Sequence, residues 1–145
     1  MVTIGQLLNS KGPQVWSVHT DTSVYDALRL MAEKGIGALV VMDDGAIVGL
    51  VSERDYARKV ILEGRSSRDT AVADIMSTVV LHAVPGMLVS EGMALMTDKR
   101  VRHLPVLDDG RTIGIVSIGD LVKSVIEEQE HVISQLEHYI SGEFA

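Results

Sequence analysis

Two short elements of the sequence place a serine three residues before an aspartate. Ser52 precedes Asp55 and Ser117 precedes Asp120, and each pair follows a glycine and two aliphatic residues. At a helix start, such a serine accepts a hydrogen bond from the third helical N–H and the carboxylate accepts one from the serine N–H, so a single occurrence is most simply a capping box. The same helix start attracts a phosphate, and an aspartate in its first turn can accept both hydroxyls of a ribose. The elements therefore fit helix caps or a nucleotide site, and one role does not exclude the other.

The two elements recur because the chain contains an internal repeat. Residues 15–60 align without a gap with residues 80–125, and 15 of the 46 positions are identical. Both copies carry the sequence Asp-Asp-Gly, at 43–45 and 108–110. Identity of about one third over an ungapped stretch indicates two copies of one supersecondary unit.

Each copy begins with a segment that predicts an amphipathic helix of about three turns behind a first strand. In the first copy, apolar residues from Val24 to Met31 recur near helical spacing. Thr22-Ser23 supplies the cap in front of this helix, and Gly35 fits its end. The second copy repeats the apolar pattern 65 residues later.

A hairpin and a second helix complete each copy. Asp-Gly in a turn between apolar strands is the strongest short-range hairpin signal. The predicted strands are 39–42 and 47–51, then 104–107 and 113–116, and the helices that follow are about 53–62 and 118–128. Each repeat is therefore β-α-β-β-α, and the fold class is α/β (α+β).

We expect three segments: a first repeat at 1–65, a second at 66–128 and a helical tail at 129–145. A unit of about 65 residues buries little core alone, so the repeats should pack sheet to sheet around a pseudo-twofold axis. The tail predicts a helix over 127–140 that covers the module or mediates self-association. Its apolar face consists of Val132, Ile133, Leu136 and Ile140.

Composition excludes several classes of function. The chain has 145 residues, a net charge of −7 and no cysteine. An acidic surface disfavours nucleic acid and anionic membranes as partners, and the lack of cysteine excludes disulfides, thiolate zinc sites and cysteine nucleophiles. No apolar run approaches the roughly 18 residues of a membrane span, and residues 1–11 do not resemble a signal peptide, so we expect a cytoplasmic protein.

The sequence contains no recognisable catalytic constellation. Ser52 and Ser117 lack a histidine and an acid in a nucleophile pattern, and no phosphate-binding glycine loop is present. His131 and His138 share a helix face but lack a further ligand at metal-binding spacing. We expect no enzymatic activity, no metal and no catalytic cofactor.

The repeated Gly-aliphatic-aliphatic-Ser-x-x-Asp element, each time behind a helix and an Asp-Asp-Gly hairpin, resembles the nucleotide motif of the cystathionine-β-synthase (CBS) domain family. The resemblance runs from about Thr3 to Val125 and matches a tandem pair, often called a Bateman module, of the small stand-alone kind. It implies a regulatory module that binds an adenosine-containing ligand between the repeats: AMP first, then ADP, ATP, NAD or S-adenosylmethionine. It also implies a homodimer that signals to a separate effector protein by a change in conformation or association.

The resemblance assigns roles to individual residues in two clefts. In one cleft Asp120 would hold the ribose, Ser117 and Thr22 would approach the phosphate, and Ile115 would press on the adenine. The same cleft would include Ala27, Gly37 and Ala38 on one wall and the positively charged Arg102 and His103 opposite. The other cleft would use Leu50, Ser52, Arg54 and Asp55.

The two clefts differ at positions that the repeat makes equivalent. The second copy has Met87 where the first has Thr22, and Gly92 where the first has Ala27. Since a phosphate-facing hydroxyl is lost, we expect the Asp120 cleft to bind phosphorylated ligand more tightly. The alternative function is a ligand-free interaction scaffold in which both elements are only caps. An enzyme acting on adenosine phosphates and a nucleic-acid-binding protein are the further rivals.

Overall fold

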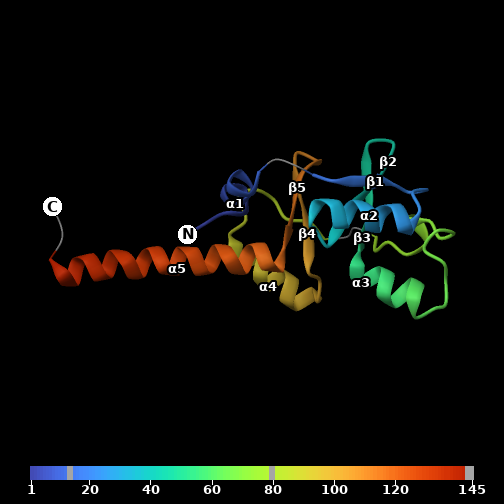
Figure 1. The fold of residues 1–145 in the computed structure, drawn as a ribbon. Helices are drawn as coiled ribbons and strands as arrows, with labels where there is room; N and C mark the ends of the chain where they lie inside the picture. Colours follow the sequence, from blue (N-terminus) through green and yellow to red (C-terminus); the bar gives the residue numbers. More distant parts are fainter. Residues whose placement is uncertain (13–14, 79–80, 143–145) are drawn as a thin grey trace. The chain divides into compact units, whose positions relative to one another are not determined.

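The computed structural model describes residues 1–12, 15–78 and 81–142 (Figure 1). The chain forms two compact units. The first-repeat unit consists of Gln14–Leu81, and the second-repeat unit consists of Met1–Pro13 together with His82–Ala145. The mixed helix and strand content agrees with the predicted fold class.

The first-repeat unit contains a three-stranded sheet of order β1-β2-β3. β1 pairs parallel with β2, and β2 pairs antiparallel with β3 around the predicted turn. The elements are β1 Ser17–His19, α2 Val24–Lys34, β2 Ala38–Asp43, β3 Ala46–Ser52, α3 Glu53–Tyr56, the π-helical turn η1 Ala57–Ile61 and the 3₁₀ turn η2 Val72–Asp74. The predicted helix at 53–62 is thus α3 continued by η1.

The core of this unit lies between α2 and the sheet. Val24, Ala27 and Met31 of α2 pack against Leu39 and the strand residues around it. Ser23 caps α2 by accepting a hydrogen bond from the N–H of Asp26 at 3.1 Å, as the sequence predicts. The rest of the core cluster is Val41, Val51, Val60, Val72 and Ile75.

The second-repeat unit repeats this arrangement with a shorter sheet. β4 and β5 form an antiparallel pair, and within residues 81–142 the first segment of the repeat contributes a single parallel bridge, from Ala83 to Val106. The strand predicted at the start of this repeat is reduced because Pro105 stands where the first repeat has Val40, whose N–H donates to Trp16 O; proline has no N–H to donate. The elements are α1 Ile4–Lys11, α4 Val89–Lys99, β4 His103–Asp108, β5 Arg111–Ser117 and α5 Ile118–Ser141.

The units differ from the predicted repeats at their edges. α1 packs with the second repeat, where Ile4 is fully buried and donates its N–H to Met87 O at 2.8 Å. Residues 66–78 return to the first repeat, where Ser77 exchanges two backbone hydrogen bonds with Leu50. α5 runs without a break across residue 129, so the segment predicted as a helical tail begins within this helix.

The hairpin turns and the first helix end form as predicted. Asp44 and Asp109 have φ of 49° and 50°, and the glycine that follows each has φ of 77°, so both central residues of each turn are left-handed. This is the turn that matches the twist of paired strands. Gly35 ends α2 in the left-handed conformation.

The glycine of each Gly-aliphatic-aliphatic-Ser element is required by close packing. A Cβ on Gly49 would lie 2.6 Å from Met76 Sδ and 2.9 Å from Ser77 O. A Cβ on Gly114 would lie 2.7 Å from Leu8 Cδ2 of α1. In each unit a segment from outside the hairpin crosses the last strand at this glycine, which explains its recurrence.

We expect Gly49→Ala to destabilise the protein by about 1–3 kcal/mol, the usual cost of overpacking. The new methyl group would collide with a backbone oxygen that is already hydrogen-bonded to Leu50. Chemical denaturation measures the change in the free energy of unfolding. Gly86→Ala is the matched control, because nothing lies within 4 Å of its Cβ position. Equal stabilities for the two variants would contradict this account of the motif glycine.

Candidate functional site

Both Ser-x-x-Asp elements form complete capping boxes at helix starts. Ser52 Oγ accepts from the N–H of Asp55 at 3.2 Å, and Asp55 Oδ2 accepts from the N–H of Ser52 at 2.9 Å. In the second copy the corresponding distances for Ser117 and Asp120 are 3.1 and 2.9 Å. The structural role inferred from the spacing is confirmed in both units.

Strand pairing brings other predicted site residues beside each capping box. In the first-repeat unit Ala38 pairs with Ser52 across β2 and β3, and Gly37 O accepts from the N–H of Glu53 at 3.1 Å. The residues 65 positions later repeat this geometry. His103 pairs with Ser117, and Arg102 O accepts from the N–H of Ile118 at 2.9 Å. Each unit thus gathers a strand start and a helix start at one place.

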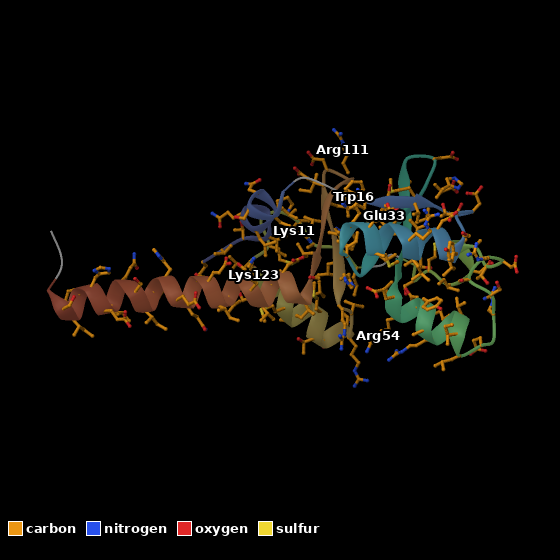
Figure 2. The ribbon with its side chains drawn as sticks, viewed as in Figure 1. Lys11, Trp16, Glu33, Arg54, Arg111 and Lys123 are labelled. Atoms are coloured by element: carbon orange, nitrogen blue, oxygen red, sulfur yellow. The ribbon has the colours of Figure 1, made fainter. Side chains whose placement is uncertain are left out.

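The remaining predicted residues occupy different environments. Thr22 lies between β1 and α2, where its hydroxyl accepts from the N–H of His19 at 3.1 Å. Ala27 has no exposed surface and Ala38 has 4% exposed, and Ala27 belongs to the core of its unit. Leu50 and Ile115 are half-buried at equivalent positions of β3 and β5, and Arg54 is exposed on α3 (Figure 2).

The residues assigned to one cleft come from both units. Thr22, Ala27, Gly37 and Ala38 belong to the first-repeat unit. Arg102, His103, Ile115, Ser117 and Asp120 belong to the second-repeat unit. The structure places Gly37 and Ala38 beside the first capping box. It places Arg102 and His103 beside the second capping box, and the cleft shared by the two sets stays a prediction.

Lys11 is a site residue that sequence reasoning missed. Its Nζ donates to Asp120 Oδ2 at 2.7 Å and to Ile115 O at 2.9 Å. It thus contacts the carboxylate assigned to the ribose and the backbone of the residue assigned to the adenine. Lys11 lies on α1, outside the repeat and 109 residues from Asp120 in the chain, so no local spacing reveals the contact.

In the first-repeat unit a lysine also contacts the motif aspartate, but it comes from a different part of the chain. Lys59 Nζ lies 3.3 Å from Asp55 Oδ1 and donates to Ile75 O at 2.9 Å. This lysine comes from the turn that continues α3, four residues after the aspartate. Each motif aspartate therefore has a lysine that also binds a backbone carbonyl, and only that of Asp120 comes from a distant helix.

The surroundings of Asp120 favour its ionised form. Burial alone would raise the pKa of this carboxyl, but the hydrogen bonds from Lys11 and from the N–H of Ser117, with the charge of Lys11, lower the pKa below its ordinary value. The carboxylate is therefore charged at neutral pH and accepts hydrogen bonds from any donor that reaches it.

A groove of ≈ 660 Å³ opens beside this pair, lined by α1 and α5 of the same unit. Its size falls within the range of small-molecule sites. Lys11 and Lys123 line it (Figure 2), together with Asp120 and five further carboxyl, hydroxyl or amide side chains: Gln6, Ser10, Ser124, Glu127 and Glu128. Among residues 1–12, 15–78 and 81–142, no cluster of three or more His, Asp or Glu is arranged to hold a metal ion. None of the described helices has the length and apolar character needed to cross a membrane.

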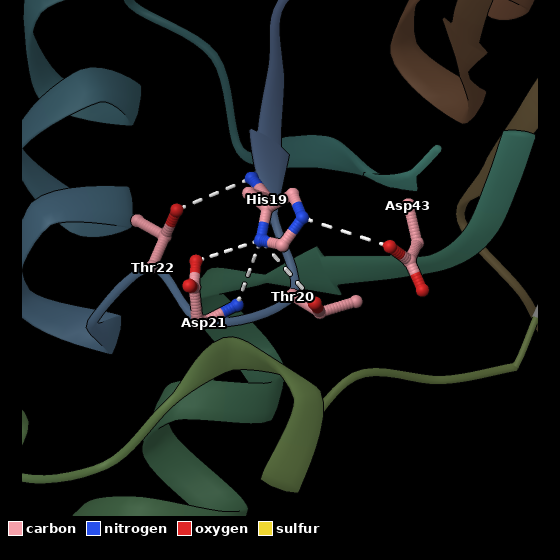
Figure 3. A network of polar contacts seen from close by, with 5 residues as sticks. All are labelled: His19, Thr20, Asp21, Thr22 and Asp43. Atoms are coloured by element: carbon pink, nitrogen blue, oxygen red, sulfur yellow. Dashed lines mark hydrogen bonds and ion pairs between the residues drawn. The ribbon is translucent and has the colours of Figure 1, made fainter. Parts of the chain in front are cut away.

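A second polar cluster surrounds His19 at the end of β1 (Figure 3). His19 Nδ1 lies 2.7 Å from Asp21 Oδ1, and its Nε2 lies 3.6 Å from Asp43 Oδ1. The hydrogen bond and charge of Asp21 raise the pKa of His19, with a smaller contribution from Asp43. Since Thr22 Oγ1 accepts from the backbone N–H of His19, the hydroxyl assigned to the phosphate lies in the same turn as this histidine.

We expect Lys11→Met to raise the pKa of Asp120, because burial then acts without the lysine. In the native protein the lowered pKa stabilises the fold above the ordinary carboxyl pKa, and this stabilisation is lost as the pH falls through the folded-state pKa. The variant should lose part of that stabilisation. Carboxyl ¹³C NMR titration reads the pKa directly. Lys123→Met, which removes another groove lysine, is the control and should leave Asp120 unchanged. An unaltered Asp120 titration in Lys11→Met would refute the assignment.

We expect Asp21→Asn to lower the pKa of His19 towards its ordinary value of about 6.5. A raised pKa means that this contact favours the folded state below the unfolded-state pKa and is lost as the pH rises through the folded-state value. Histidine proton NMR follows the titration. Asp44→Asn should shift it less, because Asp44 contributes least of the three carboxylates, Asp21, Asp43 and Asp44, that raise the pKa of His19. A larger shift in Asp44→Asn would show that Asp21 is not the principal partner.

The CBS domain profile matches residues 5–62 and 72–127. The chain is 43% identical over 150 residues to the mitochondrial CBS domain-containing protein CBSX3 of Arabidopsis thaliana, covering 97% of this chain and 72% of the relative. A solved protein with CBS domains from Burkholderia ambifaria MC40-6 superposes with a TM-score of 0.84 at 53% identity, covering 88% of this chain and 96% of that one.

A further solved structure supports the fold alone. The CBS domain pair of protein MJ0100, in complex with 5'-methylthioadenosine and S-adenosyl-L-methionine, has a TM-score of 0.78 at 22% identity and covers 88% of this chain and 98% of that chain. The two profile matches fall on the two copies of the repeat, and each copy ends its hairpin in a capped helix. The chain belongs to the CBS-domain family and is a tandem CBS pair.

Proposed function

We propose that this CBS pair is a regulatory module that binds an adenosine-containing ligand and passes the signal to a separate protein. The observation that carries the proposal is the environment of Asp120. It lies in the first turn of α5, next to Ser117 and the start of β4, and its carboxylate is held ionised by Lys11. An ionised carboxylate at a capped helix start suits two ribose hydroxyls and leaves the adjacent helix start to a phosphate.

Lys11 would respond directly to such a ligand. A ribose that donates two hydrogen bonds to Asp120 competes with the Lys11 ammonium, which lies 2.7 Å from Oδ2. Once displaced, the ammonium is a cation beside a phosphate-bearing ligand, and it favours AMP, ADP or ATP over an uncharged nucleoside. AMP is the preferred candidate, with NAD and S-adenosylmethionine as further members of the class. The ligand complex of the MJ0100 pair, a property of that protein, belongs to the same chemical class.

The two motif elements should differ in affinity. Thr22 offers a hydroxyl in the same turn as His19, whose pKa is raised by Asp21, whereas Met87 at the equivalent position of the second repeat has no hydroxyl. We therefore assign the stronger phosphorylated-ligand site to the cleft that combines Thr22 with Ser117 and Asp120. The weaker site would use Ser52 and Asp55.

The proposed mechanism is linkage between ligand binding and module conformation. A ligand that contacts both repeats stabilises one mutual arrangement of them, and an effector protein that prefers that arrangement binds more or less tightly. The chain has no catalytic role in this proposal and needs no catalytic cofactor. It acts as a homodimer, and its cytoplasmic location stays a prediction, since the Arabidopsis relative is named as mitochondrial.

One observation favours a second candidate, a scaffold without a ligand. Both motif aspartates already accept the serine N–H, and both lie beside a lysine. A protein in which these residues serve only as helix caps needs no nucleotide. The scaffold and the sensor make opposite predictions for ligand binding.

We expect Asp120→Asn to weaken binding of AMP or a related ligand at least about tenfold, because a hydrogen bond to a charged group is lost. The asparagine oxygen can still cap α5, so the fold is retained. Calorimetric titration with AMP, ADP, ATP, NAD and S-adenosylmethionine gives the affinities. A ligand at 100 times its Kd should also stabilise the native chain by about 2.7 kcal/mol in thermal unfolding.

Asp55→Asn is the matched control, since it makes the same change in the other capping box. It should cost less affinity for the phosphorylated ligand. Comparable losses in the two variants would refute the difference between the clefts. No thermal shift with any ligand of the panel would refute the sensor and favour the scaffold.

A further inference from the structure

α5 continues well beyond the part of it that packs against its own unit. Leu121, near its start, is fully buried, and Val125 is half-buried. From residue 129 to residue 142 every position is exposed. Figure 1 shows α5 running past α1 and α4, the helices of its own unit.

The exposed side of α5 carries a heptad pattern of apolar residues, which we name the outer stripe. Its members repeat at alternating intervals of four and three, and all of them are apolar except the third, Gln129. The outer stripe consists of Val122, Ile126, Gln129, Ile133, Leu136 and Ile140. The apolar members are between 40% and 83% exposed, including the two that lie in the packed half of α5. The isoleucines take one core position of the heptad, and Val122, Gln129 and Leu136 take the other.

An uncovered helix with this stripe is marginal in water. A helical segment of about 14 residues gains little stability without tertiary contacts, and most helical stability in proteins comes from packing of an apolar face. β-branched residues such as Ile126, Ile133 and Ile140 reduce helix propensity further. A second surface must therefore cover the outer stripe.

We propose that the outer stripe pairs with the outer stripe of a second copy of this chain, with the two α5 helices antiparallel. In this register Ile126 faces Leu136 of the second copy, and Ile140 faces its Val122. Ile133 then faces Gln129 of the second copy. Because the pair has twofold symmetry, each of these contacts occurs twice. The overlap from 122 to 140 is about 28 Å long at 1.5 Å per residue.

Charge determines the orientation. Lys123 and Glu137 flank the outer stripe on the same edge, 14 residues apart. The antiparallel register brings Lys123 opposite Glu137 of the second copy at both ends of the pairing. A parallel register instead places Glu130 and Glu137 opposite the apolar Val125 and Val132 of the second copy, with no oppositely charged partner.

The rest of the helix surface argues against other occupants. The acidic residues Glu127, Glu130 and Glu137 disfavour an anionic lipid surface, which attracts basic amphipathic helices. At the centre of the antiparallel register Glu130 lies opposite Glu130 of the second copy, so one like-charge contact opposes the pairing. Removing that charge should tighten the pairing.

This inference deepens the association part of the proposed function and rests on it for the existence of a homodimer, but not for ligand binding. The experiment uses the full chain and sedimentation equilibrium over a range of concentrations. Ile133→Lys should raise the dimer dissociation constant at least about tenfold, because it buries an unpaired charge. Ile133 is 54% exposed, so the substitution should not destabilise the monomer. At protein concentrations below the dimer dissociation constant, the variant and the native chain should therefore unfold at the same temperature.

A charge-exchange cycle tests the orientation. Lys123→Glu and Glu137→Lys should each weaken the dimer, and the double exchange should restore it, because the two side chains meet only across the antiparallel pair. Glu130→Gln should strengthen it. Cross-linking adds an independent measurement, since the native chain has no cysteine. A mixture of Ile126→Cys and Leu136→Cys proteins should form the mixed disulfide dimer in preference to either symmetric one.

Three results would overturn the proposal. The first is that the native chain stays monomeric at all concentrations. The second is that Ile133→Lys leaves the dimer dissociation constant unchanged. The third is that the cysteine variants form symmetric disulfide dimers in place of the mixed one. AMP titration of Ile133→Lys separates the two proposals. Intact ligand binding together with any of these results removes the α5 interface and leaves the nucleotide module standing.

Discussion

The hydrogen bond from each motif aspartate to the N–H of the serine three residues earlier fixes the start of a helix at the end of the last strand. In the second-repeat unit this bond sets the direction in which α5 leaves β5, and it holds Asp120 beside Lys11. The motif glycine acts on the same strand, because a side chain there would displace Leu8 of α1. The helix cap, the packing of α1 and the charge state of Asp120 therefore depend on one short turn.

The capping role and the proposed ligand role meet at one oxygen of the Asp120 carboxylate. The serine N–H and Lys11 both bind Oδ2 of Asp120. A ligand that displaces Lys11 therefore leaves the cap intact, because the serine N–H keeps its acceptor. Because one carboxylate oxygen accepts more than one hydrogen bond, a ligand could replace Lys11 without unfolding the start of α5. Asp120→Asn keeps an acceptor for the serine N–H and removes the charge, so it separates the two roles.

The sequence predicted much of this fold, because its signals are local. The Asp-Asp-Gly turns, the Ser23 cap and the Gly35 helix end require only the residues beside them. The first strand of the second repeat was predicted from its likeness to the first copy, and it is reduced to one bridge because Pro105 lacks the N–H that Val40 donates. Lys11 was missed because its contact with Asp120 joins a helix outside the repeat to one within it. Both capping boxes are confirmed, whereas the cleft shared by the two repeats stays a prediction.

The two copies of the repeat have diverged where they connect to the rest of the chain. The first copy ends its helix in a π-helical turn whose own Lys59 binds Asp55. The second copy receives Lys11 from α1 and continues into a helix of 24 residues. On the two proposals made here, α5 would carry the ligand carboxylate at its first turn and the self-association stripe towards its last. Because a helix is stiff along its axis, a ligand that displaces Lys11 and α1 from the start of α5 would also shift the outer stripe, which pairs with the second copy. Ligand binding and association would then be coupled through one element, in the copy that has acquired both features.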